Sequence, residues 1–216
     1  MPDKPDIALP DAVLFDMDGT LVDTEGLWWE AVAGVAASLG RTLTPGDEPH
    51  VLGRTVEDTA AHLAPGQVAG VAARLTGAFA ELIEGGVAIV PGALELLGEL
   101  SARGVPTALV SASPRGIVER VLPRLGGHRF DLVVAAEDTE RGKPYPDPYL
   151  EAAQRLGVRP ERCVAIEDSP TGVASATAAG CRVLVVDPVA GLTGVRRSLA
   201  SRTGLTGLTG LTGLAG

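Results

Sequence analysis

Five short apolar runs constrain the fold of this chain more than any other feature. They are AVLF at 12–15, VPTALV at 105–110, LVVAA at 132–136, CVAI at 163–166 and VLVV at 183–186. Continuous apolar runs of four to eight residues are typical of parallel strands that are buried on both faces. The sequence therefore predicts an α/β fold built on a parallel sheet.

Helical segments lie between the later runs and support this prediction. Each of them ends at a glycine suited to the position after a helix: 91–104, 114–126, 146–157 and 169–180. Alternating strands and helices indicate right-handed βαβ crossovers. Three Ser-Pro or Asp-Pro pairs, at 113–114, 147–148 and 169–170, predict helix starts at the carboxyl edge of the sheet, where helix dipoles favour an anion.

Residues 25–88 break the alternation and are predicted to form an inserted helical cap. Apolar residues keep helical spacing between Leu27 and Leu39, Gly40 ends that helix, and Thr55 resembles the N-cap of a later one. The predicted domains are a catalytic core (1–24 and 89–190), the cap (25–88) and a mobile Gly-Leu-Thr-rich tail (191–216).

Composition limits the partners. The 216 residues carry a net charge of -9, which repels nucleic acid and anionic membrane surfaces. The acidic, proline-containing N-terminus does not resemble a signal peptide and no uncharged run is long enough to span a membrane, so we expect a cytoplasmic protein, a monomer or weak homodimer. Cys163 and Cys181 are expected to be buried small hydrophobes.

Two aspartates follow the first apolar run directly. Asp16 and Asp18 are two positions apart, so in an extended segment both carboxylates point to the same side. Two like charges are unfavourable there unless a cation lies between them or one of them is protonated. Asp16 can then ligate a cation and attack an electrophile while Asp18 gives and takes a proton, and Gly19 and Thr20 let the chain turn.

Further polar residues end other apolar runs. Ser111, Lys143 and the Glu167-Asp168 pair supply a hydroxyl, an ammonium and two carboxylates. These groups are suited to hold a phosphoryl group and a hard cation such as Mg²⁺, with Asp16, Asp168 and the backbone carbonyl of Asp18 as ligands.

The motifs DMDGT at 16–20, Ser111, Lys143 with the following Pro-x-Pro-Asp-Pro, and Glu-Asp at 167–168 together resemble the haloacid dehalogenase-like (HAD) superfamily, in its β-phosphoglucomutase-like and sugar-phosphate phosphatase branch. The resemblance covers residues 11 to about 188. It implies a Rossmann-like core in strand order 5-4-1-2-3, with the helical cap inserted after the first strand.

The resemblance also implies roles for single residues. Asp16 corresponds to the nucleophile, Asp18 to the general acid/base, Ser111 to the phosphate-binding hydroxyl and Lys143 to the family's lysine. Asp168 corresponds to the last Mg²⁺ carboxylate, and Glu167 to a metal residue that binds directly or through water. We also expect substrate contacts at Gly19, Thr20 and Ala112. The implied reaction is Mg²⁺-dependent hydrolysis of a small phosphomonoester through an aspartyl-phosphate.

Other functions share part of this set of residues. Asp18 argues against a dehalogenase, and the lack of lysine in 25–88 excludes a phosphonate hydrolase with a cap lysine. A sugar phosphomutase stays open, although Trp28 occupies the position of the mutases' histidine. A phospho-accepting receiver domain, the non-enzymatic alternative, would carry its phosphorylated aspartate on the third strand.

Six cap residues are candidates for substrate selection: Glu25, Trp28, Trp29, His50, Arg54 and His62. Packing between helices explains the tryptophans equally well, and the histidines are expected on the surface. Arg54 is the strongest candidate, as the partner of a second anionic group on the substrate.

Overall fold

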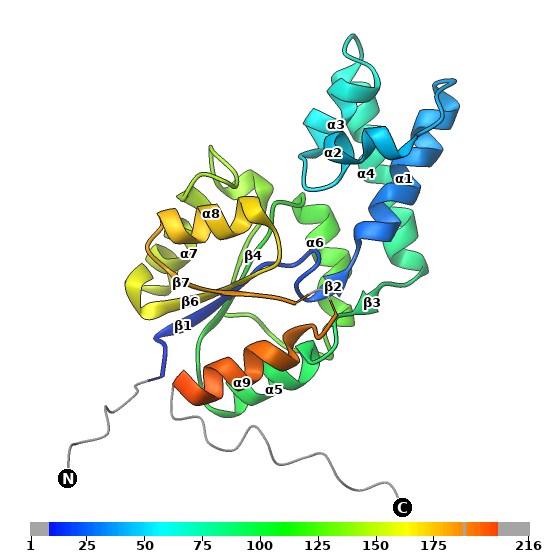
Figure 1. The fold of residues 1–216 in the computed structure, drawn as a ribbon. Helices are drawn as coiled ribbons and strands as arrows, with labels where there is room; N and C mark the ends of the chain where they lie inside the picture. The colour runs from blue at the N-terminus through cyan, green and yellow to red at the C-terminus, as the bar shows by residue number, and fades with distance from the viewer. Residues whose placement is uncertain (1–8, 188, 203–216) are drawn as a thin grey trace, which may run out of the picture.

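The structure is a computed structural model that describes residues 9–187 and 189–202. A five-stranded parallel sheet forms its centre, in the order β5-β4-β1-β6-β7 (Figure 1). Its strands are β1 Ala12–Phe15, β4 Thr107–Val110, β5 Leu132–Val134, β6 Cys163–Glu167 and β7 Arg182–Val185. Numbered without the two short strands outside this sheet, and read from the β7 edge, the order is 5-4-1-2-3. The predicted Rossmann-like α/β class is confirmed.

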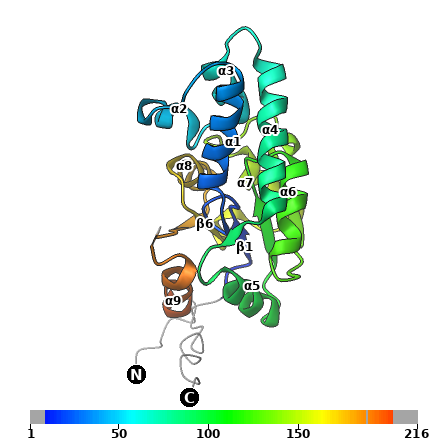
Figure 2. The ribbon, with the colours of Figure 1, turned by 90° about the vertical axis from the view of Figure 1, so that its right-hand side faces the viewer.

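Helices cover both faces of this sheet. Alternate residues of β1 separate the two layers, since Val13 and Phe15 pack toward α5, α6 and α9 while Ala12 and Leu14 pack toward α7 and α8. Figure 2 shows α5 and α9 side by side below the sheet. The core helices are α5 Ala93–Ala102, α6 Arg115–Val121, α7 Asp147–Leu156, α8 Pro170–Ala178 and α9 Leu192–Arg202.

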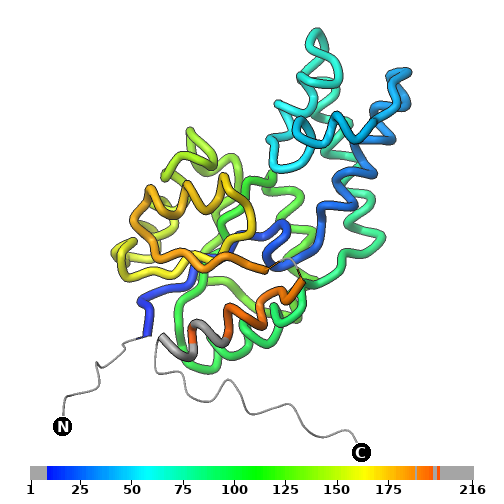
Figure 3. The backbone as a smooth tube through the Cα atoms, in the orientation of Figure 1, coloured from blue at the N-terminus to red at the C-terminus, as the bar shows by residue number. Residues whose placement is uncertain are grey.

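A helical cap lies between two short strands that pair with each other, β2 Val22–Asp23 and β3 Ala88–Ile89. Figure 3 traces the chain through it and back to the core. The cap has its own apolar core, which includes Val32, Leu63 and Leu75. Its helices are α1 Glu25–Ser38, α2 Glu48–Val51, α3 Val56–Leu63 and α4 Val68–Gly85. The sequence did not predict β2 and β3, because pairs of residues carry no periodic signal.

Of the predicted helix starts, two are confirmed and two are wrong. Thr55 caps α3 and Ser169 caps α8, each accepting a hydrogen bond from the backbone N–H three residues later. Asp147 is the first residue of α7, and Pro146 takes the N-cap position. Pro114 takes that position in α6, because the Ser113 side chain bonds elsewhere.

The expected mobile tail from residue 191 is wrong for residues 192–202. They form α9, because Leu192, Val195 and Leu199 recur at helical spacing and are buried against the α5 side of the core. The glycine content of the segment hid this apolar stripe. Residues 203–216, the rest of the predicted tail, lie outside the described part.

The turn before α9 meets the linker that leads from the cap back to the core. The Leu192 N–H donates to the Pro91 carbonyl at 2.9 Å. A Cβ on Gly191 would lie 2.7 Å from the same carbonyl oxygen, so only glycine permits this approach. The C-terminal helix is thereby joined to the base of the cap.

Candidate active site

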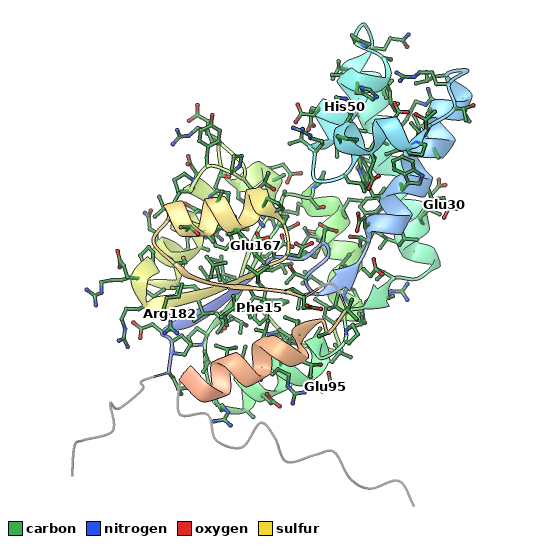
Figure 4. All side chains as sticks on the ribbon, in the orientation of Figure 1. Phe15, Glu30, His50, Glu95, Glu167 and Arg182 are labelled. Carbon is green, nitrogen blue, oxygen red and sulfur yellow. The ribbon has the colours of Figure 1, made fainter. Side chains whose placement is uncertain are left out.

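The predicted polar residues converge at the carboxyl edge of β1, β4 and β6. A cavity of about 540 Å³ opens there between core and cap, and its wall includes Asp16, Asp18, Lys143 and Asp168. Arg54 and Trp28 contribute from the cap side. In Figure 4 the labelled Glu167 lies at this edge, at the end of β6 and below α8.

Asp16 lies at the centre of the site and is almost completely buried. Its Oδ1 accepts a hydrogen bond from the Lys143 ammonium at 2.6 Å. Its Oδ2 is buried without a hydrogen-bond partner among the described residues. Burial raises the pKa of Asp16 well above its usual value, against the opposing charge of Lys143. A buried carboxylate oxygen without a donor is unfavourable by roughly 1–3 kcal/mol, which makes Oδ2 a strong candidate for a cation ligand.

Asp18 is held by three hydroxyl groups. Thr24 donates to its Oδ1 at 2.8 Å, and Ser113 donates to its Oδ2 at 2.8 Å, with Ser111 farther away at 3.5 Å. Burial raises the pKa of Asp18, although these hydrogen bonds partly offset it. The raised pKa favours the protonated form of this carboxyl group.

Lys143 joins two carboxylates. Its ammonium donates to Asp16 and, at 2.5 Å, to Glu167 Oε1. Burial alone would lower the pKa of Lys143, but these two carboxylates more than offset that effect and raise it overall. The lysine is therefore a fixed cation at the floor of the cavity.

A cation fits the acidic cluster. Asp16, Glu167 and Asp168 offer carboxylate oxygens that all lie within 4.8 Å of one another. Partial loss of hydration at the wall of the cavity, and then the charge of Glu167, raise the pKa of Asp168 to about 6. When ionised, these three carboxylates and the Lys143 ammonium together leave two negative charges, which one divalent cation balances. Oxygen donors of this kind suit a hard cation.

Glu167 is less free than its place in this cluster suggests. Its side chain is fully buried and already accepts hydrogen bonds from Lys143, from the Tyr149 hydroxyl at 2.7 Å and from the Ser169 hydroxyl at 3.2 Å. Asp168, in contrast, is exposed to the cavity and accepts a longer bond from Thr20 at 3.3 Å. Asp16 and Asp168 are thus the more available metal ligands.

Gly19 and Thr20, which follow the two aspartates, both contact Asp168. Gly19 has a positive φ of 81°, and a Cβ at this position would lie 2.0 Å from Asp168 Oδ2. Its N–H donates to Val22 O, and the hydroxyl of the buried Thr20 donates to Asp168. Both residues were predicted to contact substrate. Gly19 lines the cavity, whereas Thr20 is buried and is not among the residues that line it.

The loop after β4 forms one side of the cavity. Ser111 is buried and accepts a hydrogen bond from the Ser113 N–H at 3.0 Å. Ala112 and Ser113 face the cavity. The Ala112 N–H makes no hydrogen bond to any residue of the described ranges, which leaves it free for a ligand.

The cap candidates divide into two groups. Glu25, Trp28 and Arg54 line the cavity. Trp28 also packs edge-on against Phe79 and donates to Val51 O, so it has a packing role as well. Trp29, His50 and His62 are not among the residues that line it. His62 is half-buried rather than exposed, because it pairs with Asp47 at 2.7 Å and stacks on His50.

Four residues of the site were not predicted from the sequence: Thr24, Ser113, Tyr149 and Ser169. Ser113 and Ser169 had been noticed only as helix caps. The sequence did not indicate a role for Tyr149 in the site, because a tyrosine on the apolar face of a helix is usually part of the hydrophobic core.

Comparison with known proteins places the chain in a family. The sequence profile of the haloacid dehalogenase-like hydrolases matches residues 10–180. The chain belongs to this family. The resemblance identified from its motifs is therefore confirmed.

Individual relatives agree with this assignment. Hexitol phosphatase A of Escherichia coli (strain K12) is 37% identical over 81% of this chain and 82% of its own length. Validoxylamine A 7'-phosphate phosphatase of Streptomyces hygroscopicus subsp. limoneus is 34% identical over 77% and 81%. The crystal structure of CbbY from Rhodobacter sphaeroides in complex with phosphate superimposes with a TM-score of 0.75, at 33% identity, over 82% of this chain and 86% of that chain.

Of the helices in the described ranges, none combines the length and apolar character needed to cross a membrane.

Proposed function

We propose that this protein is a Mg²⁺-dependent phosphatase that hydrolyses a small phosphomonoester, a sugar or hexitol phosphate, through an aspartyl-phosphate on Asp16. The observation that carries this proposal is the pairing of Asp16 with Lys143 beside Asp18, with one Asp16 oxygen left without a donor. The names of the relatives, which include a hexitol phosphatase, support the substrate class.

The first half-reaction is an in-line displacement at phosphorus. An Asp16 oxygen forms a bond to phosphorus while the bond to the ester oxygen breaks, and Asp18 gives its proton to that departing oxygen. The raised pKa of Asp18 favours the protonated form that this step needs. Lys143 balances negative charge on the phosphoryl oxygens, and the Ser111 to Ser113 loop supplies hydrogen-bond donors.

The second half-reaction returns the enzyme to its first state. Asp18, now ionised, takes a proton from water as the water oxygen bonds to phosphorus and the bond to Asp16 breaks. Inorganic phosphate leaves. Asp16, Asp168 and the backbone carbonyl of Asp18 would hold Mg²⁺, which supplies positive charge for the phosphoryl oxygens when it is bound. Glu167 belongs to the same acidic cluster, and it would affect the metal site at least indirectly, by holding Lys143 in place.

In this proposal residues 25–88 act as the cap that selects the ester, and 1–24 with 89–190 carry the chemistry. Arg54 and Glu25 would meet the part of the substrate away from the phosphate. Location in the cytoplasm and a monomeric or weakly dimeric state remain predictions from the sequence.

A phosphate-release screen over hexitol, hexose and other metabolite monophosphates tests the proposal. We expect release with Mg²⁺ and none with EDTA, restored when Mg²⁺ is added in excess. Chromatography of the sugar product separates the phosphomutase alternative, which would give an isomerised phosphate ester without free phosphate. Absence of phosphate release from every ester at saturating Mg²⁺ would refute the proposal.

A further inference from the structure

One buried polar group near the site has no part in the reaction described above: the hydroxyl of Tyr149 in α7. The side chain is fully buried on the α7 side of the sheet. Its hydroxyl donates to Glu167 Oε1 at 2.7 Å, and the Lys143 ammonium lies 5.3 Å from the centre of its ring. A buried phenol with one hydrogen bond to a buried carboxylate is an electrostatic feature as well as a packing one.

Glu167 is fixed on every side by such contacts. Its Oε1 accepts from both Tyr149 and Lys143, and its Oε2 accepts from the Ser169 hydroxyl. The first turn of α8 is built around this carboxyl, because a Cβ on Gly172 would lie only 1.9 Å from Oε1. The carboxylate can therefore hold the lysine in one position.

This second anchor matters during the reaction. Lys143 has three ammonium protons, and its carboxylate partners are Asp16 and Glu167. When Asp16 carries the phosphoryl group, its carboxylate has become an acyl phosphate and no longer holds the ammonium as a full negative charge. Of the two carboxylate partners of Lys143, Glu167 alone keeps its charge through the whole cycle.

We propose that Tyr149 is a positioning residue of this reaction: its hydroxyl fixes Glu167, which holds Lys143 against the phosphoryl group while Asp16 is esterified. The inference rests on the proposed phosphatase function. It predicts that loss of one oxygen atom, far from the substrate, lowers the rate of the chemical steps and leaves substrate binding unchanged.

The test compares Tyr149→Phe with Tyr145→Phe, at the other tyrosine of the chain, whose exposed ring stacks on Arg141. We expect Tyr149→Phe to lower kcat about 10-fold, the scale of one lost hydrogen bond to a charged group, with KM within about twofold of wild type. The inhibition constant of orthovanadate, a phosphoryl-transfer mimic, should rise in parallel. Tyr145→Phe should change neither quantity.

A double-mutant cycle separates positioning from simple packing. If Tyr149 acts through Glu167, adding Tyr149→Phe to Glu167→Gln should change kcat by less than about twofold, because the two effects are coupled. Additive losses in kcat, or a Tyr149→Phe enzyme with wild-type kcat, would overturn the inference. If Tyr149→Phe lowers the melting temperature, assays well below it and the vanadate constant still report on the folded enzyme.

The two proposals fail in different ways. A wild-type protein that releases phosphate from no ester refutes the phosphatase proposal. An active wild type with an unaffected Tyr149→Phe variant refutes only the role of Tyr149.

Discussion

The core side and the cap side of the cavity hold their polar groups in different ways. On the core side, the buried Lys143 ammonium donates to Asp16 at 2.6 Å and to Glu167 at 2.5 Å, and both carboxylates are buried as well. On the cap side, Glu25 and Arg54 are exposed. Arg54 donates only to the Pro49 carbonyl, and Glu25 has no partner among the described residues. The difference indicates that the core fixes the chemistry, while the cap can change its contacts with little cost to the fold.

Of the substitutions on the core side, Asp16→Asn should have the largest effect on activity. We expect kcat to fall by at least ~10⁴-fold, since the nucleophile is lost, without loss of folding stability, because a buried carboxylate is removed. Phosphate release and a thermal melt measure the two effects. Asp11→Asn, at a partly exposed aspartate paired with Arg162, is the control and should keep wild-type activity. Substantial turnover by purified Asp16→Asn would contradict the assignment.

The close contact between Gly19 and the Asp168 carboxylate gives the second largest expected effect. Gly19→Ala places a Cβ on the Asp168 carboxylate, so we expect kcat/KM to fall about 100-fold and the Mg²⁺ concentration for half activity to rise about 10-fold. A Mg²⁺ titration of activity measures this. Gly40→Ala has a similar φ of +75° but open space around its Cβ, and so reproduces the backbone strain alone. Equal effects of both variants would show that strain, not Asp168, is responsible.

Removal of a hydroxyl that holds the acid should have a smaller effect. Ser113→Ala takes away the 2.8 Å bond to Asp18, and we expect kcat to fall about 10-fold with little change in KM. Steady-state kinetics with Ser101→Ala, at an exposed serine of α5, provide the comparison. A Ser113→Ala enzyme that loses only substrate affinity would assign the hydroxyl to the substrate instead.

On the cap side, Arg54→Ala should raise KM for the preferred ester about 5- to 10-fold and leave kcat and the melting temperature nearly unchanged, because the side chain is exposed. Arg103→Ala, at an exposed arginine of the core, is the matched control. An unchanged KM would show that Arg54 is a solvated surface residue without a role in substrate binding. A large drop in kcat would contradict the division of roles between cap and core.

The smallest effect concerns the two cysteines. Burial raises the pKa of Cys163 to about 11 and of Cys181 to about 12. At pH 8 roughly 0.1% or less of either thiol is ionised, so we expect no reaction with a thiol reagent until the protein is unfolded in denaturant. Absorbance with Ellman's reagent, with and without denaturant, measures this. Rapid labelling of the native protein would contradict the burial of both side chains.

The sequence predicted the core better than the connections. All five strands of the sheet were found, because a strand buried on both faces leaves a continuous apolar run. Asp16, Asp18, Ser111 and Asp168 were found because each lies within two or three residues of the end of such a run, and Lys143 was found in the motif GKPYPDP. Their roles in catalysis and metal binding remain predictions, which the variants above test.

What the sequence did not predict depends on contacts between distant segments. Tyr149 and Glu167 meet only once α7 and β6 are packed together, and no spacing in the sequence encodes that meeting. Ser113 was predicted to be a helix N-cap, because serine before proline often occupies that position. In the structure its hydroxyl donates to Asp18 instead, a bond that the sequence pattern does not predict. The α9 segment was misread because its glycines outweighed three leucine and valine positions whose partner helix lies about a hundred residues earlier.

The bond between Leu192 and Pro91 has a consequence for synthesis on the ribosome. The cap and its return linker leave the exit tunnel first, and the Pro91 carbonyl then lacks its partner until residues 191 and 192 emerge. The joint at the base of the cap is therefore completed only after a segment about a hundred residues farther along the chain has been translated.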